Sequence, residues 1–110
     1  DDMSVVLGAN GTAYSFKNAF ESFDGIVAEG AVPLVELGFM PRALASGSTT
    51  IFHYRANVTP PRDMALWTRL VTAFATQLVA RYTLRVVRHW LFEVFNEPNC
   101  GFYDAPRAQY

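Results

Sequence analysis

The sequence has one cysteine, no long apolar run and almost no net charge, and each shortage excludes a class of protein. The single Cys100 excludes an internal disulfide and a metal site built from cysteines alone. No apolar stretch is long enough to span a bilayer. Nine Lys and Arg residues against ten Asp and Glu residues leave a formal charge of −1. The basic residues are scattered, so nothing predicts binding to nucleic acid or to an anionic membrane.

Apolar residues, in contrast, are abundant. Of the 110 residues, 51% are hydrophobic and 15% are aromatic, which is typical of a sequence that forms a packed core. The length corresponds to about one small domain. The chain opens on DDMSVV, which is neither a signal peptide nor an initiator methionine, and closes on RAQY. We therefore expect residues 1–110 to be part of a domain that is truncated at both ends, with no indication of compartment or oligomeric state.

The first third of the chain predicts a hairpin, a helix and a buried strand. The pair Asn10-Gly11 lies between two short apolar runs, which is a strong signal for a tight turn. A helix is predicted to begin at Asn18, with Glu21 three residues later in a variant of the capping box. Its apolar face is formed by Phe16, Phe20, Phe23 and Val27, and Gly30 is expected to end it. Residues 32–39 then read as a buried strand.

The remaining residues predict a loop, a long helix and a second buried strand. Residues 40–62 contain Gly and Pro breakers and predict a long loop, a type of connection that is often functional. Asp63 is expected to cap a helix that runs to Tyr82. A short link over 83–89 leads to an apolar strand over 90–95. The helix face is formed by Trp67, Leu70, Val71, Phe74, Leu78 and Tyr82.

This order of helix, strand, helix and strand predicts two parallel strands joined by a helical crossover. Both an open sheet and a closed (β/α)8 barrel fit such a pair. Chemistry in parallel α/β folds collects at the carboxyl ends of strands, and polar residues follow both predicted strands. We therefore expect residues 36–42 and 95–103 to share one end of the sheet, and this clustering favours the barrel.

Three blocks carry a resemblance to a known family. They are VELGFMPRALASG at 35–47, NVTPP at 57–61 and WLFEVFNEPN at 90–99. In this order they resemble the catalytic domain of glycoside hydrolase family 39, which contains β-xylosidases and α-L-iduronidases, and they are more similar to the β-xylosidase branch. The resemblance implies an α/β fold that is a fragment of a (β/α)8 TIM barrel, from roughly the end of strand 2 to the loop after strand 4.

The resemblance also implies a retaining glycosidase that acts on β-linked xylose and uses no cofactor. Glu97 matches the glutamate that acts as general acid/base, and Asn96 matches the asparagine that bonds the sugar hydroxyl beside the anomeric carbon. The nucleophilic glutamate is expected beyond Tyr110, so this chain alone should be inactive. Physical chemistry agrees, because a proton donor must be partly desolvated for its pKa to rise, and aromatic residues surround Glu97 in the sequence.

Further residues are predicted around this pair. His53, in an aromatic stretch of the long loop, is a candidate for sugar contact, although a cluster packed on the barrel rim is an equal alternative. Phe102 and Tyr103 are candidates for a platform that stacks on the sugar ring. Glu36 and Glu93 lie inside apolar strands, and we expect both to be buried structural carboxylates held by an Arg or by backbone donors.

The sequence departs from the family pattern at two positions. Phe95 stands where the family usually has Trp, which keeps an aromatic wall but removes an indole N–H donor. Thr83 stands where a Gly often closes the preceding helix. Strict strand alternation also puts Asn96 and Glu97 on opposite sides, so the strand must twist, bulge or end if both face a ligand.

Two alternatives from other classes stay open. One is a carbohydrate-binding barrel that has lost its nucleophile, which the sequence after Tyr110 would decide. The other is a structural α/β domain without chemistry, in which Asn96 and Glu97 would be exposed and far from any cleft.

Overall fold

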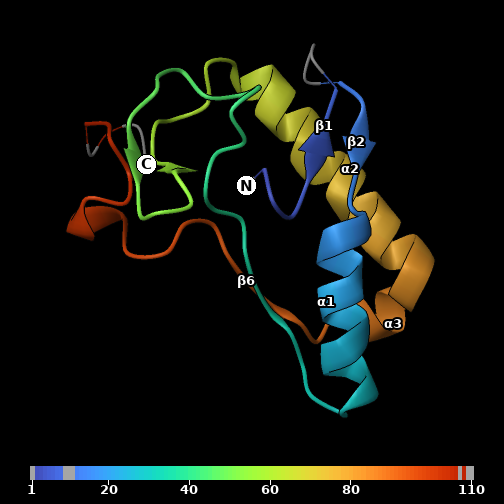
Figure 1. Cartoon of the computed structure of the whole chain (residues 1–110). Coiled ribbons are helices and arrows are strands. Elements are labelled where there is room, and N and C mark those ends of the chain that lie inside the picture. Colours follow the sequence, from blue (N-terminus) through green and yellow to red (C-terminus); the bar gives the residue numbers. More distant parts are fainter. Residues whose placement is uncertain (1, 9–11, 107, 109–110) are drawn as a thin grey trace.

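The structure, a computed structural model, describes residues 2–8, 12–106 and 108. The helices and the Asn-Glu-Pro region lie on opposite sides of a central pair of strands (Figure 1). In chain order the elements are β1 (Val6–Leu7), β2 (Tyr14–Ser15), α1 (Lys17–Ala28), β3 (Leu34–Glu36), β4 (Thr50–Ile51), β5 (Ala56–Asn57), α2 (Met64–Tyr82), α3 (Leu84–Val87), β6 (Leu91–Glu93) and the 3-10 turn η1 (Pro98–Cys100).

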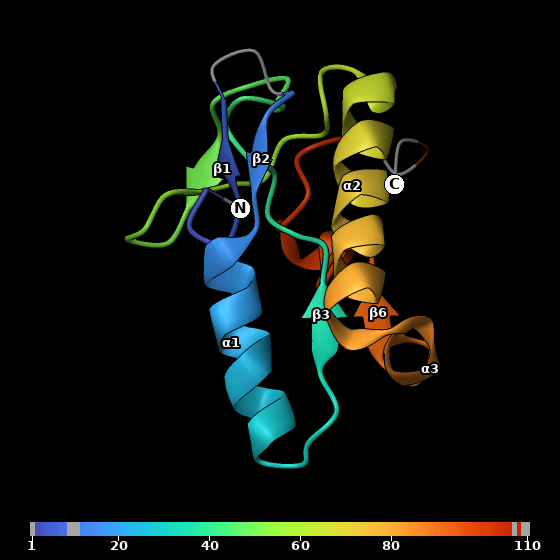
Figure 2. The same ribbon diagram turned by 90° about the vertical axis from the view of Figure 1, so that its right-hand side faces the viewer.

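Strands β3 and β6 form the predicted parallel pair. Leu34 pairs with Leu91, and the register continues to Glu36 opposite Glu93. The Leu37 N–H donates to the Glu93 carbonyl at 2.8 Å, so the pairing extends past the strand ends. Figure 2 shows the two strands side by side and pointing the same way, with the helices beside them. The prediction of parallel strands joined through a helix is confirmed.

The core lies where α1 and α2 pack together through aromatic rings. Phe16 and Phe74 are buried, and their ring centroids are 5.3 Å apart. Trp90 is also buried and packs on Phe23 at 5.4 Å and on Tyr82 at 4.8 Å. These contacts confirm both predicted helix faces and the core position of Trp90. Trp67 is half-buried against the same core.

The two helix starts differ in how well the sequence predicts them. Asp63 caps α2 as expected, because its carboxylate accepts the Ala65 N–H at 2.7 Å. The predicted cap at Asn18 is wrong. Helix α1 begins at Lys17 after Phe16, which has no side-chain cap, and Asn18 instead donates to the Met3 carbonyl at 2.7 Å. Burial of the Phe16 ring draws the helix start forward, which leaves Asn18 inside the first turn.

The strands are shorter and more exposed than the sequence predicts. Strand β3 has three residues, not the eight expected over 32–39, and β6 also has three. Val35 is buried against the helices, whereas Leu34 and Leu91 are 57% and 63% exposed. The prediction of fully buried strands is therefore wrong for the described residues, because the helices cover only one face of this pair.

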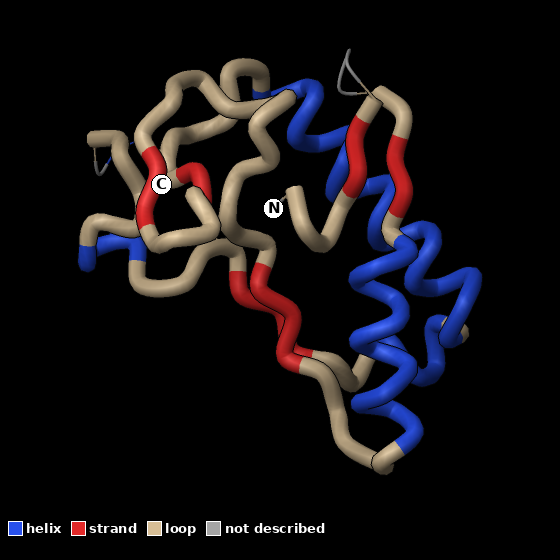
Figure 3. Tube along the Cα trace, viewed as in Figure 1, coloured by secondary structure: helices blue, strands red, loops and turns tan. Residues whose placement is uncertain are grey.

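The segment over 40–62 is not structureless, although the sequence predicts a loop. It folds back as the β4–β5 hairpin, in which Thr50 pairs with Asn57 and Ile51 with Ala56. Isolated bridges also join Met40 to Asn57 and Ala45 to Pro61. Figure 3 shows this hairpin among the loops, apart from the paired helices α1 and α2. Very short strands without alternation give little sequence signal.

Two smaller expectations have mixed outcomes. Strands β1 and β2 pair antiparallel, which confirms a hairpin, although its predicted turn at Asn10-Gly11 lies outside the described residues. Gly30 follows the end of α1 with φ +75°, as a helix-ending glycine does. Within the part of the chain that the structure describes, no helix has the length and apolar character needed to cross a membrane.

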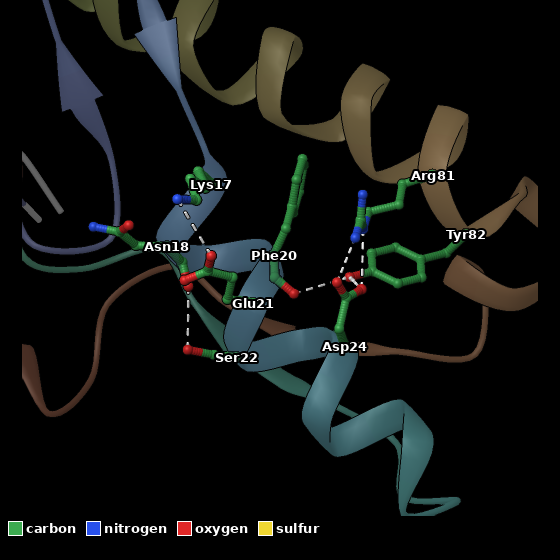
Figure 4. Close-up of polar contacts among 8 residues, drawn as sticks. All are labelled: Lys17, Asn18, Phe20, Glu21, Ser22, Asp24, Arg81 and Tyr82. Atoms are coloured by element: carbon green, nitrogen blue, oxygen red, sulfur yellow. Dashed lines mark hydrogen bonds and ion pairs between the residues drawn. The ribbon is translucent and has the colours of Figure 1, made fainter.

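A polar network also fastens α1 to α2. The Arg81 guanidinium makes two hydrogen bonds to the Asp24 carboxylate, and the Tyr82 hydroxyl donates to the same carboxylate at 2.6 Å (Figure 4). These hydrogen bonds, that of Arg81 first, lower the pKa of Asp24 from 3.8 to about 2. Burial, and next the hydrogen bond to Asp24, raise the pKa of Tyr82.

Replacing Thr83 by Gly should stabilise the protein. Thr83 ends α2 with φ 68° and ψ 149°, a region that is essentially restricted to glycine. Relief of this strain, less the flexibility that Gly adds to the unfolded chain, should raise the free energy of unfolding by roughly 1 kcal/mol. Thermal unfolding followed by circular dichroism measures it. Thr76→Gly, inside α2, is the matched control and should lower the midpoint, and a loss in both variants would contradict the strain argument.

Replacing Asp24 by Asn should remove a pH-dependent part of the stability. Because folding lowers the pKa of Asp24, the network stabilises the fold fully above about pH 4, and this contribution is lost as the pH falls toward 2. Urea unfolding from pH 7 to pH 2 should show the wild type and Asp24→Asn converging as the pH falls. Glu21→Gln, which removes an exposed ion pair to Lys17, is the control and should show little of this effect. A constant gap between wild type and Asp24→Asn would exclude the network as the cause.

Candidate active site at the carboxyl ends of β3 and β6

The segments that follow β3 and β6 lie together at one end of the sheet. The ring of Phe39, after β3, lies 5.7 Å from the ring of Phe95 and 6.1 Å from that of Phe102, both after β6. The parallel register places both segments there, because equivalent residues of the two strands are neighbours. The prediction that residues 36–42 and 95–103 share one end of adjacent parallel strands is confirmed.

Phe95 is the buried member of an aromatic wall formed by Phe39, Phe52, Phe95, Phe102 and Tyr103. It is 3% exposed, and its ring lies 5.1 Å from that of Tyr103. A Cβ atom at Gly38 would lie 3.5 Å from the Phe95 ring, so the backbone two residues beyond β3 packs directly on this ring. Phe95 is thus an apolar support of the site.

The backbone changes direction at the Asn-Glu-Pro sequence. Strand β6 ends at Glu93, three residues before Asn96. Glu97 has left-handed torsions, φ 46° and ψ 52°, and its carbonyl accepts the Cys100 N–H at 2.9 Å in the turn that follows. Strand alternation therefore stops before Asn96, as the sequence requires if both polar side chains are to face one ligand. A left-handed glutamate is uncommon, and such outliers cluster at functional sites.

Glu97 is exposed and Asn96 is half-buried. The desolvation of Glu97 that the sequence predicts is absent from the described residues. The rings that were expected to surround it pack on one another instead, with Phe102 against Phe52 at 5.5 Å and Tyr103 against Phe95. The described residues thus place the Glu97 carboxylate at the end of the sheet and leave it exposed.

The β4–β5 hairpin brings its tip to the aromatic wall. Phe52 contacts Phe39 at 6.1 Å and stacks on Tyr54 at 5.4 Å. His53 is exposed, and its ring lies edge-on to Tyr54 at 5.2 Å. Phe52 thus packs on the aromatic wall, as the alternative predicts, whereas the His53 side chain is exposed. Phe102, half-buried beside Phe52, and His53 lie on the same rim.

The interpretation of Glu36 and Glu93 as buried, Arg-held carboxylates is wrong. Glu36 is exposed, Glu93 is half-buried, and the two are direct neighbours in the register. The described ion pairs and side-chain hydrogen bonds include neither of them. Their face of the strand pair is the one that the helices leave open, so burial does not force a partner on either carboxylate.

Two further features bear on the chemistry near the site. Cys100, directly after the Asn-Glu-Pro turn, is an exposed free thiol. Among the residues that the structure describes, no three His, Cys, Asp or Glu side chains are grouped so that they could hold a metal ion.

No sequence pattern predicts the polar pocket of about 210 Å³ that lies beside the β4–β5 hairpin. Its lining comes from three separate parts of the chain, and no motif connects them in the sequence. The lining residues are Asp2, Arg42, Gly47, Ser48, Thr50, Arg55 and Asn57.

The family model of Glycosyl hydrolases family 39 matches residues 1–109, almost the whole chain. The chain belongs to this family. The resemblance inferred from the three sequence blocks is therefore confirmed, and the chain is part of a family of glycoside hydrolases.

Two curated relatives are named beta-xylosidase. That from Caldicellulosiruptor saccharolyticus is 45% identical over 101 residues, covering 90% of this chain and 21% of the relative. That from Geobacillus stearothermophilus is 43% identical over 99 residues, covering 88% of this chain and 20% of the relative. The chain thus spans about a fifth of the length of the curated relatives it matches.

A solved family 39 structure has the same fold over this region. The GH39 beta-xylosidase from Caulobacter crescentus superposes with a TM-score of 0.86 at 37% identity, covering 97% of this chain and 24% of that chain. Family 39 enzymes have a TIM-barrel catalytic domain, so the small α/β unit seen here is similar to part of such a barrel.

Proposed function

We propose that this chain forms part of the catalytic barrel of a retaining β-xylosidase and that Glu97 is its general acid/base. The observation that carries the proposal is the place of Glu97, in an Asn-Glu-Pro turn directly beyond a parallel strand. Catalytic residues of such barrels lie at the carboxyl ends of strands. The names of the two curated relatives support xylo-oligosaccharides as the substrate class.

In this proposal β3 and β6 are the third and fourth strands of the barrel, and the chain runs from the end of strand 2 to the loop after strand 4. The exposed apolar faces of Leu34 and Leu91 support this position, because the closed interior of a barrel would cover them. The same enclosure would also shield the Glu97 carboxylate from solvent, the kind of environment in which catalytic proton donors are found.

Hydrolysis with retention requires a proton donor and a nucleophile on opposite sides of the bond, with carboxyl groups about 5 Å apart. Glu97 donates a proton to the leaving oxygen and then takes one from the attacking water. Asn96 donates an amide hydrogen bond to the hydroxyl beside the anomeric carbon, a bond that strengthens as charge develops. The nucleophilic glutamate lies on the seventh strand, beyond Tyr110.

The rim of the site contacts the rest of the sugar. His53 offers ring nitrogens to sugar hydroxyls from the hairpin tip, where it is exposed. Phe102 and Tyr103 present half-buried rings, an apolar surface with one hydroxyl, against which a sugar ring can stack. All three belong to segments that meet at the aromatic wall.

In a protein of the relatives' full length that carries this chain, Glu97→Ala should slow hydrolysis by about 10²- to 10⁴-fold for substrates with poor leaving groups. Activated aryl leaving groups barely need protonation, so their glycosylation step should be much less affected. Added azide should restore part of the loss, because it replaces the water that Glu97 activates. Steady-state kinetics on alkyl and nitrophenyl β-xylosides measures both effects.

Two further variants control this experiment. Glu97→Gln keeps the shape of the side chain and should show the same loss of acid catalysis. Glu29→Ala removes an exposed carboxylate at the distant end of α1 and should behave as wild type. Equal losses on both substrate types, without azide rescue, would exclude Glu97 as the acid/base.

The 110-residue chain alone should not hydrolyse an aryl β-xyloside above background. It has one carboxylate in a suitable motif, and the unpaired edges of β3 and β6 should make it poorly soluble. The assay is release of nitrophenol by the purified chain. Monodisperse chain that hydrolysed the substrate, and lost this activity in Glu97→Gln, would show that the nucleophile is already present.

A further inference from the structure

The polar pocket beside the β4–β5 hairpin has a positive lining. Arg42 and Arg55 both line it, with Asp2 as its one acidic residue. The Asp2 carboxylate accepts the backbone N–H of Arg42 at 3.1 and 3.2 Å, while the Arg42 Nε lies 3.9 Å away. The Arg42 side chain is 84% exposed, so this long ion pair neutralises its charge only weakly. Arg55 has no ion pair with any residue that the structure describes.

The floor of the pocket is rigid. Asn57 and Thr59 are 6% and 4% exposed, and their side chains are joined by a 2.7 Å hydrogen bond. Both hold Gly47, because Asn57 donates to its carbonyl at 2.9 Å and Thr59 accepts its N–H at 3.1 Å. A Cβ atom at Gly47 would lie 3.0 Å from Thr59 Cγ2, so a larger residue there would press on the Thr59 side chain. Ser48 and Thr50, two residues that carry hydroxyls, also line the pocket.

The hairpin tip connects the pocket to the candidate active site. Residues Phe52 and Arg55, at its two ends, have φ values of 58° and 57°, and the Arg55 N–H donates to the Phe52 carbonyl at 3.1 Å. Such strained torsions persist only where the surrounding structure holds them, and they are frequent at binding sites. One four-residue turn thus supplies Phe52 to the aromatic wall and Arg55 to the polar pocket.

We infer that this pocket binds the carboxylate of an acidic sugar unit, a uronic acid, carried by the polysaccharide that is cleaved at Glu97. Guanidinium groups match a carboxylate with paired, charge-assisted hydrogen bonds, and two of them line the pocket. The hydroxyls of Ser48 and Thr50 suit the hydroxyls of the sugar. A volume of about 210 Å³ is below that of pockets for drug-sized ligands and suits a single sugar unit. The link to cleavage rests on the proposed function, whereas binding of the acidic sugar does not.

Titration calorimetry of the full-length protein with D-glucuronate tests binding without any need for catalysis. Wild type should bind glucuronate, and Arg55→Gln and Arg42→Gln should each weaken binding about tenfold or more, the usual loss for a hydrogen bond to a charged group. Arg69→Gln, an exposed arginine on α2, is the matched control and should bind as wild type. Arg55→Lys keeps the charge but not the paired geometry and should fall between them. Circular dichroism checks that each variant is folded.

Acetate and D-xylose separate the carboxylate from the sugar. Acetate that bound as tightly as glucuronate, with the same loss in Arg55→Gln, would reduce the pocket to a general anion site and overturn the inference. Unchanged glucuronate binding in both Arg55→Gln and Arg42→Gln, or an equal loss in Arg69→Gln, would overturn it as well.

Hydrolysis distinguishes this inference from the proposed function. Glucuronate-substituted and unsubstituted xylo-oligosaccharides are compared, and the ratio of their kcat/KM values should fall about tenfold in Arg55→Gln and stay constant in Arg69→Gln. A protein that cleaved neither substrate but bound glucuronate through these arginines would contradict the proposed function and keep the pocket. A protein that cleaved both with a ratio insensitive to Arg55 would contradict the link between pocket and cleavage.

Discussion

The parallel hydrogen bonding between β3 and β6 determines where every residue of the candidate active site lies. These strands are separated by more than fifty residues, yet the register sets Glu36 beside Glu93. The segments that follow the two strands therefore begin at the same edge of the sheet. A shift of the register by one residue would turn the side chains to the opposite face. The helices stabilise this register by burying Val35 on one side of the pair.

The two sides of the molecule are stabilised by different kinds of interaction. On the helical side, aromatic rings such as Phe16 and Phe74 bury a continuous apolar core, reinforced by the Asp24 carboxylate between the helices. On the other side, buried polar groups organise the loops. Asn57 and Thr59 satisfy each other and the backbone of Gly47, which lets a segment with only two short strands hold one shape.

The β4–β5 hairpin lies between two regions of opposite character. One side is the apolar wall around Phe95, directly beneath the Asn-Glu-Pro turn, and the other is the polar pocket with its arginines. An apolar wall suits the face of a sugar ring and excludes water, whereas guanidinium groups suit a charged substituent. Under the proposed function, these two regions would contact a sugar chain at two separate points.

The sequence alone determined the presence and apolar faces of α1 and α2, the parallel pairing and the end of the strands at which the site lies, whereas α3 lies in a segment predicted as a link. Periodicity marked the faces of α1 and α2, Asp63 marked a helix start, and the Asn-Glu-Pro block marked Glu97. These signals are local, since they depend on residues a few positions apart. Only the tertiary structure decided the start of α1, where burial of Phe16 overrode the cap expected at Asn18.

The same distinction applies to the site. That Phe52 packs on Phe102, that Glu36 and Glu93 are open neighbours, and that Arg42 and Arg55 share a pocket all depend on segments far apart in the chain. No local pattern encodes such contacts, because each arises when the parallel register and the hairpin bring distant backbone together. The sequence therefore identified the chemical groups, and the three-dimensional packing decided which of them meet.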